Sequence, residues 1–266
     1  MNDEMRLFLG FEALAPWPSQ FPNGRMIETK SRHITTAFFG NTSLFRLTSL
    51  LDDMPKPPWN VGTVGIFDKV LFLPQNRPRV VALNALPLTH SDPFFSYQMH
   101  LITWFEEKNY QLDKRDFLPH VTLARSPFNA TEWKNLFSPL PYFTSSLHLY
   151  KSLGNLQYEI IWSHQIKPPF TEIEHVADIA FQISGQTPEE IHQNAQIALS
   201  FHCPEILPYL KRENLSKSLP QIMMDLNDLV SLADQEIGTP FKAVSYHGDL
   251  LQNKDGTLTW MMIIDV

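Results

Sequence analysis

Two tripeptides of the same pattern hold the residues best suited to chemistry: His33-Ile34-Thr35 and His120-Val121-Thr122. Each lies in a run of β-forming residues, and on a strand the residues i and i+2 point to the same face. We therefore expect each histidine to lie beside a threonine hydroxyl, while the apolar residue between them packs into the core.

Two such strands side by side would present two imidazoles and two hydroxyls to one pocket. Histidine suits proton transfer at neutral pH because its acid and base forms coexist there. One neutral ring can take a proton from water, a protonated ring can give one to a departing oxygen, and hydroxyls can hold non-bridging oxygens. The arrangement suits cleavage of a phosphodiester without a metal ion. The alternative is that each tripeptide is an ordinary strand histidine, as a single His-x-Thr usually is.

The elements that must position these residues alternate between strands and helices in the first part of the chain. Apolar alternation and β-forming residues predict strands over residues 6–13, 33–39, 63–73, 79–83, 120–124 and 158–162. A helix is predicted over 42–51, and a second begins at Asp92-Pro93 with Phe95, Met99 and Ile102 on one face.

The adjacent prolines Pro168 and Pro169 predict a linker, because they continue neither a helix nor a central strand. We therefore divide the chain into domains of residues 1–168 and 169–266. In the second domain we expect strands over 173–184, 241–246 and 258–266, with helices beginning at the capping signals Thr187-Pro-Glu-Glu190 and Ser218-Leu-Pro-Gln221. Ile222, Leu226, Leu229, Val230 and Ala233 form one face of the second of these helices. The predicted fold class is α+β.

Charge divides the chain at the same place. Residues 1–168 hold 16 Lys and Arg against 14 Asp and Glu, a net charge of +2, whereas residues 169–266 hold 5 against 14, a net charge of −9. A nucleic acid would therefore bind the first domain, and a cation or a basic partner would suit the second. The single cysteine, the acidic start and the lack of a long apolar run favour a cytoplasmic protein with no membrane contact.

The first domain resembles the RNA 2′,3′-cyclic phosphodiesterases of the two-histidine phosphoesterase family, formerly called 2′–5′ RNA ligases. Residues 6–13 (RLFLGFEA) resemble the first strand of that family, residues 31–40 (SRHITTAFFG) its first motif, and residues 118–125 (LPHVTLAR) its second. Residues 14–30 are rich in proline and short for the helix that usually follows the first strand. The resemblance implies two lobes that flank a cleft, with the histidines on opposing strands.

The resemblance also implies the roles of the residues. His33 would be the proton donor, His120 the proton acceptor, and Thr35 and Thr122 would bind the phosphate, with no cofactor. Arg125, just beyond the second motif, would either clamp a phosphate with two hydrogen bonds or be an ordinary surface arginine. The substrate would be RNA that ends in a 2′,3′-cyclic phosphate.

The second domain resembles archease, a small protein that assists the tRNA-splicing RNA ligase. The resemblance lies in residues 174–179 (EHVADI), in residues 242–247 (KAVSYH) and in the closing Ile264-Asp265-Val266. It implies a divalent metal, Ca²⁺ or Mg²⁺, bound by Asp178, Asp265 and Val266, since hard oxygen ligands suit these ions. At 97 residues from Phe170 to the end, the domain is short for archease.

Together these resemblances predict a two-lobed phosphodiesterase that opens cyclic phosphate ends, joined to an archease-like domain that assists an RNA ligase as partner. Two alternatives remain open. The chain is a non-catalytic adaptor that binds RNA ends for a ligase, or it acts on small cyclic nucleotides.

Overall fold

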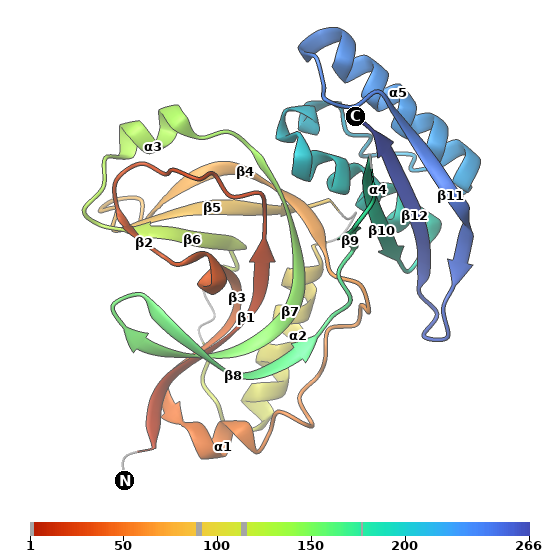
Figure 1. Cartoon of the computed structure of the whole chain (residues 1–266). Helices are drawn as coiled ribbons and strands as arrows, with labels where there is room; N and C mark the ends of the chain where they lie inside the picture. Colours follow the sequence, from red (N-terminus) through yellow and green to blue (C-terminus); the bar gives the residue numbers. More distant parts are fainter. Residues whose placement is uncertain (1–2, 89–91, 113–115, 177) are drawn as a thin grey trace.

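Two antiparallel sheets, one in each half of the chain, organise the α+β structure (Figure 1). The computed structural model describes residues 3–88, 92–112, 116–176 and 178–266. The first sheet spans residues 4–165 and the second residues 170–265. No helix in the described part of the chain is long and apolar enough to cross a bilayer.

The first sheet has the strand order β1-β3-β6-β5-β4-β7-β8, and the two-residue strand β2 pairs with β6. Because β1 also pairs with β7, six of these strands form a closed circuit of hydrogen-bonded neighbours. The strands are β1 (Glu4–Leu14), β2 (Arg25–Met26), β3 (His33–Ser43), β4 (Val64–Leu73), β5 (Val80–Pro87), β6 (His120–Arg125), β7 (Leu140–Gly154) and β8 (Gln157–Gln165). The strands predicted over 63–73 and 79–83 are confirmed, and they pair with each other as β4 and β5.

Three α-helices and a 3-10 turn accompany this sheet: η1 (Thr29–Ser31), α1 (Leu44–Thr48), α2 (Pro93–Glu107) and α3 (Ala130–Leu136). Residues 15–28 contain no helix, in line with the short proline-rich segment between the first two predicted strands. The helix predicted over 42–51 is only one turn and a half long, because β3 continues through Ser43.

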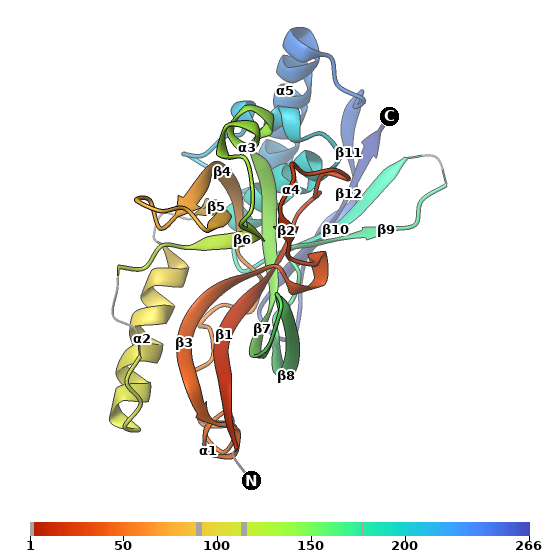
Figure 2. The same cartoon turned by 90° about the vertical axis from the view of Figure 1, so that its left-hand side faces the viewer.

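Helix α2 lies beside β3 and begins as predicted, with the Asp92 side chain accepting from the Phe95 amide (Figure 2). Its predicted face is wrong for Phe95 and Met99, which are 49% and 46% exposed, and is confirmed for Ile102, which is buried. The buried face consists of Phe94, Tyr97, Leu101, Ile102 and Phe105. These side chains lie at helical spacing and carry more aromatic surface than the predicted set, so this face enters the core.

The second sheet has the order β11-β12-β10-β9, from β9 (Phe170–Ile173), β10 (Ile179–Gly185), β11 (Ala243–Gln252) and β12 (Leu258–Asp265). Its helices are α4 (Pro188–His202), the 3-10 turn η2 (Pro204–Tyr209) and α5 (Leu219–Ile237). Both predicted helix starts are confirmed: Thr187 caps α4, and Ser218 is the N-cap residue of α5. The predicted apolar face of α5 is buried.

The segment predicted as a linker is packed into the structure. The Gly62 amide donates to the Lys167 carbonyl, the Lys167 amide donates to the Asn60 carbonyl, and Ile166 and Phe170 are only 4% and 5% exposed. The chain therefore passes from one sheet to the other without a free hinge.

Helix α4 joins the two halves, because it contacts β10 and β12 of the second sheet as well as β4 and β7 of the first. Ten consecutive residues, Ile191–Ser200, are buried. A helix buried all round must satisfy its polar groups within the protein. Accordingly, Asn194 donates to the Ser184 carbonyl and Gln193 to the Leu88 carbonyl of the first half. The second hydrophobic core also includes Val64 and Ile66 of β4.

Candidate active site

The two histidine strands meet at one residue pair. Ile34 of β3 pairs with Val121 of β6, both fully buried, and the ladder between the two strands contains this pair alone. Because the strands are antiparallel, His33 lies toward Thr122 and Thr35 toward His120 on either side of that pair. The predicted strands and the predicted side-chain alternation are confirmed, since Ile34 and Val121 enter the core while the histidines and threonines are partly exposed.

Both imidazole rings are held in the same way. His33 Nδ1 lies 2.7 Å from the Ser31 carbonyl oxygen, and His120 Nδ1 lies 2.7 Å from the Leu118 carbonyl oxygen. A carbonyl only accepts, so each Nδ1 carries the proton, and Nε2 of the neutral ring is the acceptor. Each histidine thus uses the carbonyl two residues before it to fix its tautomer and to leave Nε2 for a substrate.

Aromatic side chains surround the first histidine. The ring of His33 lies 4.7 Å from Phe8, 4.8 Å from Tyr150 and 5.4 Å from Tyr158, measured between centroids. Burial lowers the pKa of His33 to about 4, against the opposing effect of the Ser31 carbonyl, and the charges of protonated His120 and His148 lower it further. Because Ile34 pairs with Val121, the two predicted catalytic histidines lie on neighbouring strands.

A glycine makes room for the His33 ring. A Cβ on Gly10 of β1 would lie 3.0 Å from the Ile34 carbonyl oxygen and 3.2 Å from Cδ2 of His33. Both contacts are tighter than side chains normally make, so any other residue at position 10 would displace the ring or the strand beneath it.

The second histidine has a different neighbourhood. His120 pairs with Asn84 of β5, whose Nδ2 donates to Oδ1 of Asp68 at 2.7 Å. Burial lowers the pKa of His120, and the Leu118 carbonyl opposes the change. His120 and Thr35 both line a pocket of about 490 Å³, bounded also by Val80, Ile102, Phe117 and other residues. That volume lies within the range of small-ligand sites. His33 and Thr122 lie outside the lining of this pocket.

A third histidine and a carboxylate lie beside His33 and were missed by the sequence analysis. His148 Nδ1 hydrogen-bonds to Ser163 Oγ at 2.8 Å, and its Nε2 lies 3.9 Å from Oε2 of Glu12. The interaction with His148 is the chief cause of the lowered pKa of Glu12, which also accepts from Ser145 Oγ at 2.9 Å. The alternation of the first strand places Glu12 on the face of Gly10, but nothing in the sequence indicated that His148 would join it.

The arginines near the two motifs differ in placement. Arg125 is exposed at the end of β6, where it pairs with Arg25 of β2 and Val80 of β5. Arg32 is 5% exposed and packs against the rings of Trp17 and Phe21, at 4.5 and 5.0 Å. Burial lowers the pKa of Arg32 to about 10. Of these three guanidinium groups, those of Arg25 and Arg125 lie at the surface and that of Arg32 is buried.

The residues predicted to hold a metal lie at one end of two neighbouring strands. Asp178 precedes Ile179, which pairs with Ile264, the residue before Asp265. Lys242 Nζ donates to the Val266 carbonyl oxygen at 2.6 Å. Within the described ranges, no group of three or more His, Cys, Asp or Glu side chains is placed to hold a metal ion. Two carboxylates next to a lysine ammonium are a poor fit for Ca²⁺, which takes six to eight oxygen ligands.

Comparisons with known proteins give structural neighbours only. No family model and no curated protein matches the sequence. The chain is similar to LigT of E. coli complexed with 3′-AMP (19% identity, TM-score 0.46, 61% of this chain and 98% of that chain). It is also similar to TT0787 of Thermus thermophilus (17%, 0.46, 62% and 99%) and to a structure described as a phosphoesterase (18%, 0.43, 62% and 99%).

Proposed function

We propose that the protein hydrolyses 2′,3′-cyclic phosphate ends of RNA to 2′-phosphates, with His33 and His120 as the catalytic residues. The observation that carries the proposal is the meeting of two His-x-Thr strands at Ile34 and Val121, each ring with its Nδ1 bound to a backbone carbonyl. Two imidazoles held alike at one place supply both proton transfers that ring opening needs.

In the proposed reaction, Nε2 of His120 takes a proton from water as the water oxygen attacks phosphorus. The bond from phosphorus to O3′ breaks, and protonated His33 gives its Nε2 proton to O3′, so that the phosphate stays on O2′. The hydroxyls of Thr35 and Thr122 donate to the non-bridging oxygens. Because both proton transfers come from side chains, we expect the reaction to continue in the presence of a chelator.

The order of the two histidines in this scheme follows the sequence resemblance, and their surroundings oppose it in the free protein. Burial lowers the pKa of both rings, more strongly for His33 than for His120. A proposed donor with a pKa of about 4 is neutral at pH 7, so the negative phosphate must raise that pKa when it binds. The donor role of His33 thus depends on the charge of the substrate.

The test is to incubate the protein with a short RNA that ends in a 2′,3′-cyclic phosphate, with EDTA present, beside His33→Ala and His120→Ala. We expect ring opening to a 2′-phosphate by the unaltered protein, and a loss of about 10² to 10⁴ in kcat for each variant. Binding of the RNA without hydrolysis would favour the non-catalytic adaptor. A preference for mononucleotides would favour a small cyclic nucleotide phosphodiesterase.

For the second half we propose a role in assisting a tRNA-splicing RNA ligase in the cytoplasm, supported by the three archease-like segments and the net charge of −9. The test is multiple-turnover ligation by such a ligase, with and without the protein. The Ca²⁺ or Mg²⁺ site at Asp178, Asp265 and Val266 stays a prediction. Calorimetric titration of the protein and of Asp265→Asn with CaCl₂ tests it: equal or absent heats in the two proteins would reject it.

A further inference from the structure

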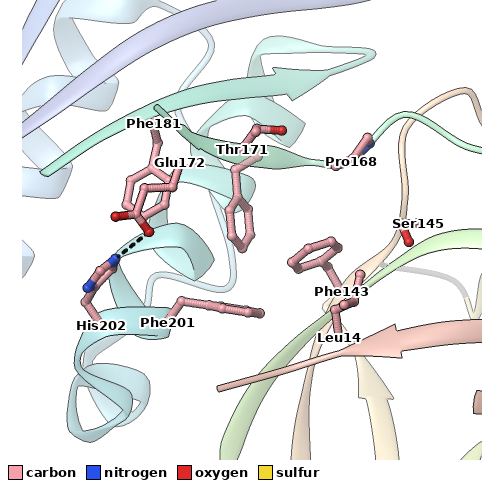
Figure 3. A pocket seen from close by; sticks show the side chains of 10 residues that line it. Leu14, Phe143, Ser145, Pro168, Thr171, Glu172, Phe181, Phe201 and His202 are labelled. Atoms are coloured by element: carbon pink, nitrogen blue, oxygen red, sulfur yellow. Dashed lines mark hydrogen bonds and ion pairs between the residues drawn. The ribbon is translucent and has the colours of Figure 1, made fainter. Parts of the chain in front are cut away.

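A second pocket of about 490 Å³ lies where the two halves meet, and it shares no lining residue with the His120 pocket (Figure 3). The first half contributes Leu14, Phe143 and Ser145, and the second contributes residues of β9, β10 and α4. The rings of Phe143, Phe170 and Phe201 lie 4.8 to 5.4 Å from one another, between centroids. A cavity lined by phenylalanines suits a flat, uncharged and largely apolar ligand.

The pocket lies on the face of β1 that carries the candidate active site. Residues Phe8, Gly10, Glu12 and Leu14 alternate with the core residues of the strand, so they share one face. Glu12 pairs with His33 in the β1–β3 ladder, and Leu14 pairs with Phe143 in the β1–β7 ladder. Two residues of strand span about 7 Å, so the pocket begins close to the reacting histidine.

A polar link connects the two places. Ser145, which lines the pocket, donates to Glu12, and Glu12 lies 3.9 Å from His148 and pairs with His33 in the β1–β3 ladder. The Glu12 charge is therefore paired rather than presented alone to a passing phosphate. At the opposite edge, His202 Nε2 lies 3.1 Å from Oε2 of Glu172 (Figure 3). The carboxylates of Glu12 and Glu172 are therefore each close to a histidine.

We infer that this pocket binds a nucleobase of the RNA, upstream of the nucleotide that carries the cyclic phosphate, an inference that rests on the proposed function. A base offers two flat faces to phenylalanine rings, and such stacking contributes about 1–3 kcal/mol per base without regard to sequence. The pocket lies between the first half and the acidic second half, which would repel a phosphate but not a neutral base. The second half thereby completes the substrate site of the first.

The experiment compares two substrates with the same cyclic end, a mononucleotide and a trinucleotide, using Phe201→Leu. Phe201 is partly exposed, and leucine keeps apolar volume while it removes the ring. We expect KM for the trinucleotide to rise about fivefold or more, while kcat and the mononucleotide KM stay unchanged. The matched control is Phe45→Leu, because Phe45 is 79% exposed in α1, at the end of the first half remote from the pocket (Figure 1).

A trinucleotide with an abasic upstream position separates stacking from folding. We expect it to show the raised KM already with the unaltered protein, and no further rise with Phe201→Leu. The inference would be overturned if Phe201→Leu raised KM equally for the mononucleotide and the trinucleotide. It would also be overturned if the unaltered protein showed no preference for the trinucleotide.

Binding of a labelled trinucleotide that ends in a 2′-phosphate separates this inference from the proposed function. If the protein opens no cyclic phosphate but Phe201→Leu still weakens binding of this probe, the proposed reaction fails and the base site stands. If hydrolysis is normal and probe binding is equal in both proteins, the base site fails and the proposed reaction stands.

Discussion

His33 and His120 share a motif but differ in their surroundings. Each donates Nδ1–H to the carbonyl two residues earlier and has a threonine two residues later. The ring of His33, however, lies among aromatic side chains and has a pKa of about 4, whereas His120 borders an open pocket beside the Asn84–Asp68 pair. A repeated motif therefore fixes the orientation of a ring, and the neighbouring strands set its protonation.

The largest effect that distinguishes the two histidines should come from a change of leaving group. A nitrophenyl phosphodiester expels an anion that needs no proton, so the loss of the proton donor should matter little with this substrate. We expect His33→Ala to recover most of its loss on the nitrophenyl ester, while His120→Ala stays impaired on both. If His120→Ala instead recovered its activity on the nitrophenyl ester, His120 would be the proton donor. That assignment would agree with the pKa of His33 being the more strongly lowered of the two in the free protein.

A smaller effect should follow from crowding the His33 ring. In Gly10→Ala the added methyl would lie 3.2 Å from Cδ2 of His33, and nothing comparable affects His120. We expect kcat to fall about tenfold, as for a misplaced catalytic group, with a smaller change in KM. Gly154→Asn is the control: a Cβ there meets nothing within 4 Å, and asparagine tolerates its φ of +84°. Full activity in Gly10→Ala would show that the ring has more room than the contacts indicate.

The pH dependence of kcat/KM should reflect the lowered pKa values of both rings. A base–acid pair is most active between its two pKa values, whichever ring plays each part. Since burial lowers both below 6.5, and that of His33 to about 4, we expect the maximum of kcat/KM below pH 6.5. A maximum at pH 7 or above would mean that the free protein solvates these rings more than the structure indicates.

The smallest effect concerns stability and a buried histidine outside the site. His192 of α4 accepts from the Ser216 amide through Nδ1, and burial lowers its pKa to about 4, opposed by Asp225 and assisted by Lys211. Between about pH 6.5 and 4 the unfolded chain therefore binds the proton that the folded protein excludes. The free energy of unfolding should fall as the pH drops through this window, by about 3 kcal/mol from this group.

His192→Asn keeps an acceptor for the Ser216 amide and removes the titration. Denaturant unfolding of both proteins at pH 7 and pH 4.5 measures the difference. We expect the variant to lose less stability than the unaltered protein over this range, with unchanged activity at pH 7. An identical loss in the two proteins would exclude His192 as a source of the acid sensitivity.

Features that depend on local spacing could be predicted from the sequence, whereas the surroundings of the two histidines could not. The two His-x-Thr strands, the capped start of α4 and the buried face of α5 were predictable because each depends on local spacing. Strand β7 was not, since it is buried along most of its length and its first seven residues (LPYFTSS) show no regular alternation of apolar and polar residues. Because His148 and Tyr150 belong to β7, they were missed as well. The sequence therefore located the pair of histidines but not the groups that separate their pKa values.

The central claim is that His33 and His120 act as one unit on one phosphate. Residues that act together lose activity non-additively, so kcat for His33→Ala, His120→Ala and the double variant tests this claim most directly. We predict that kcat of the double variant on cyclic-ended RNA is only slightly lower than kcat of the less active single variant. A loss equal to the product of the two single losses would contradict the account, since it would mean that the histidines act independently.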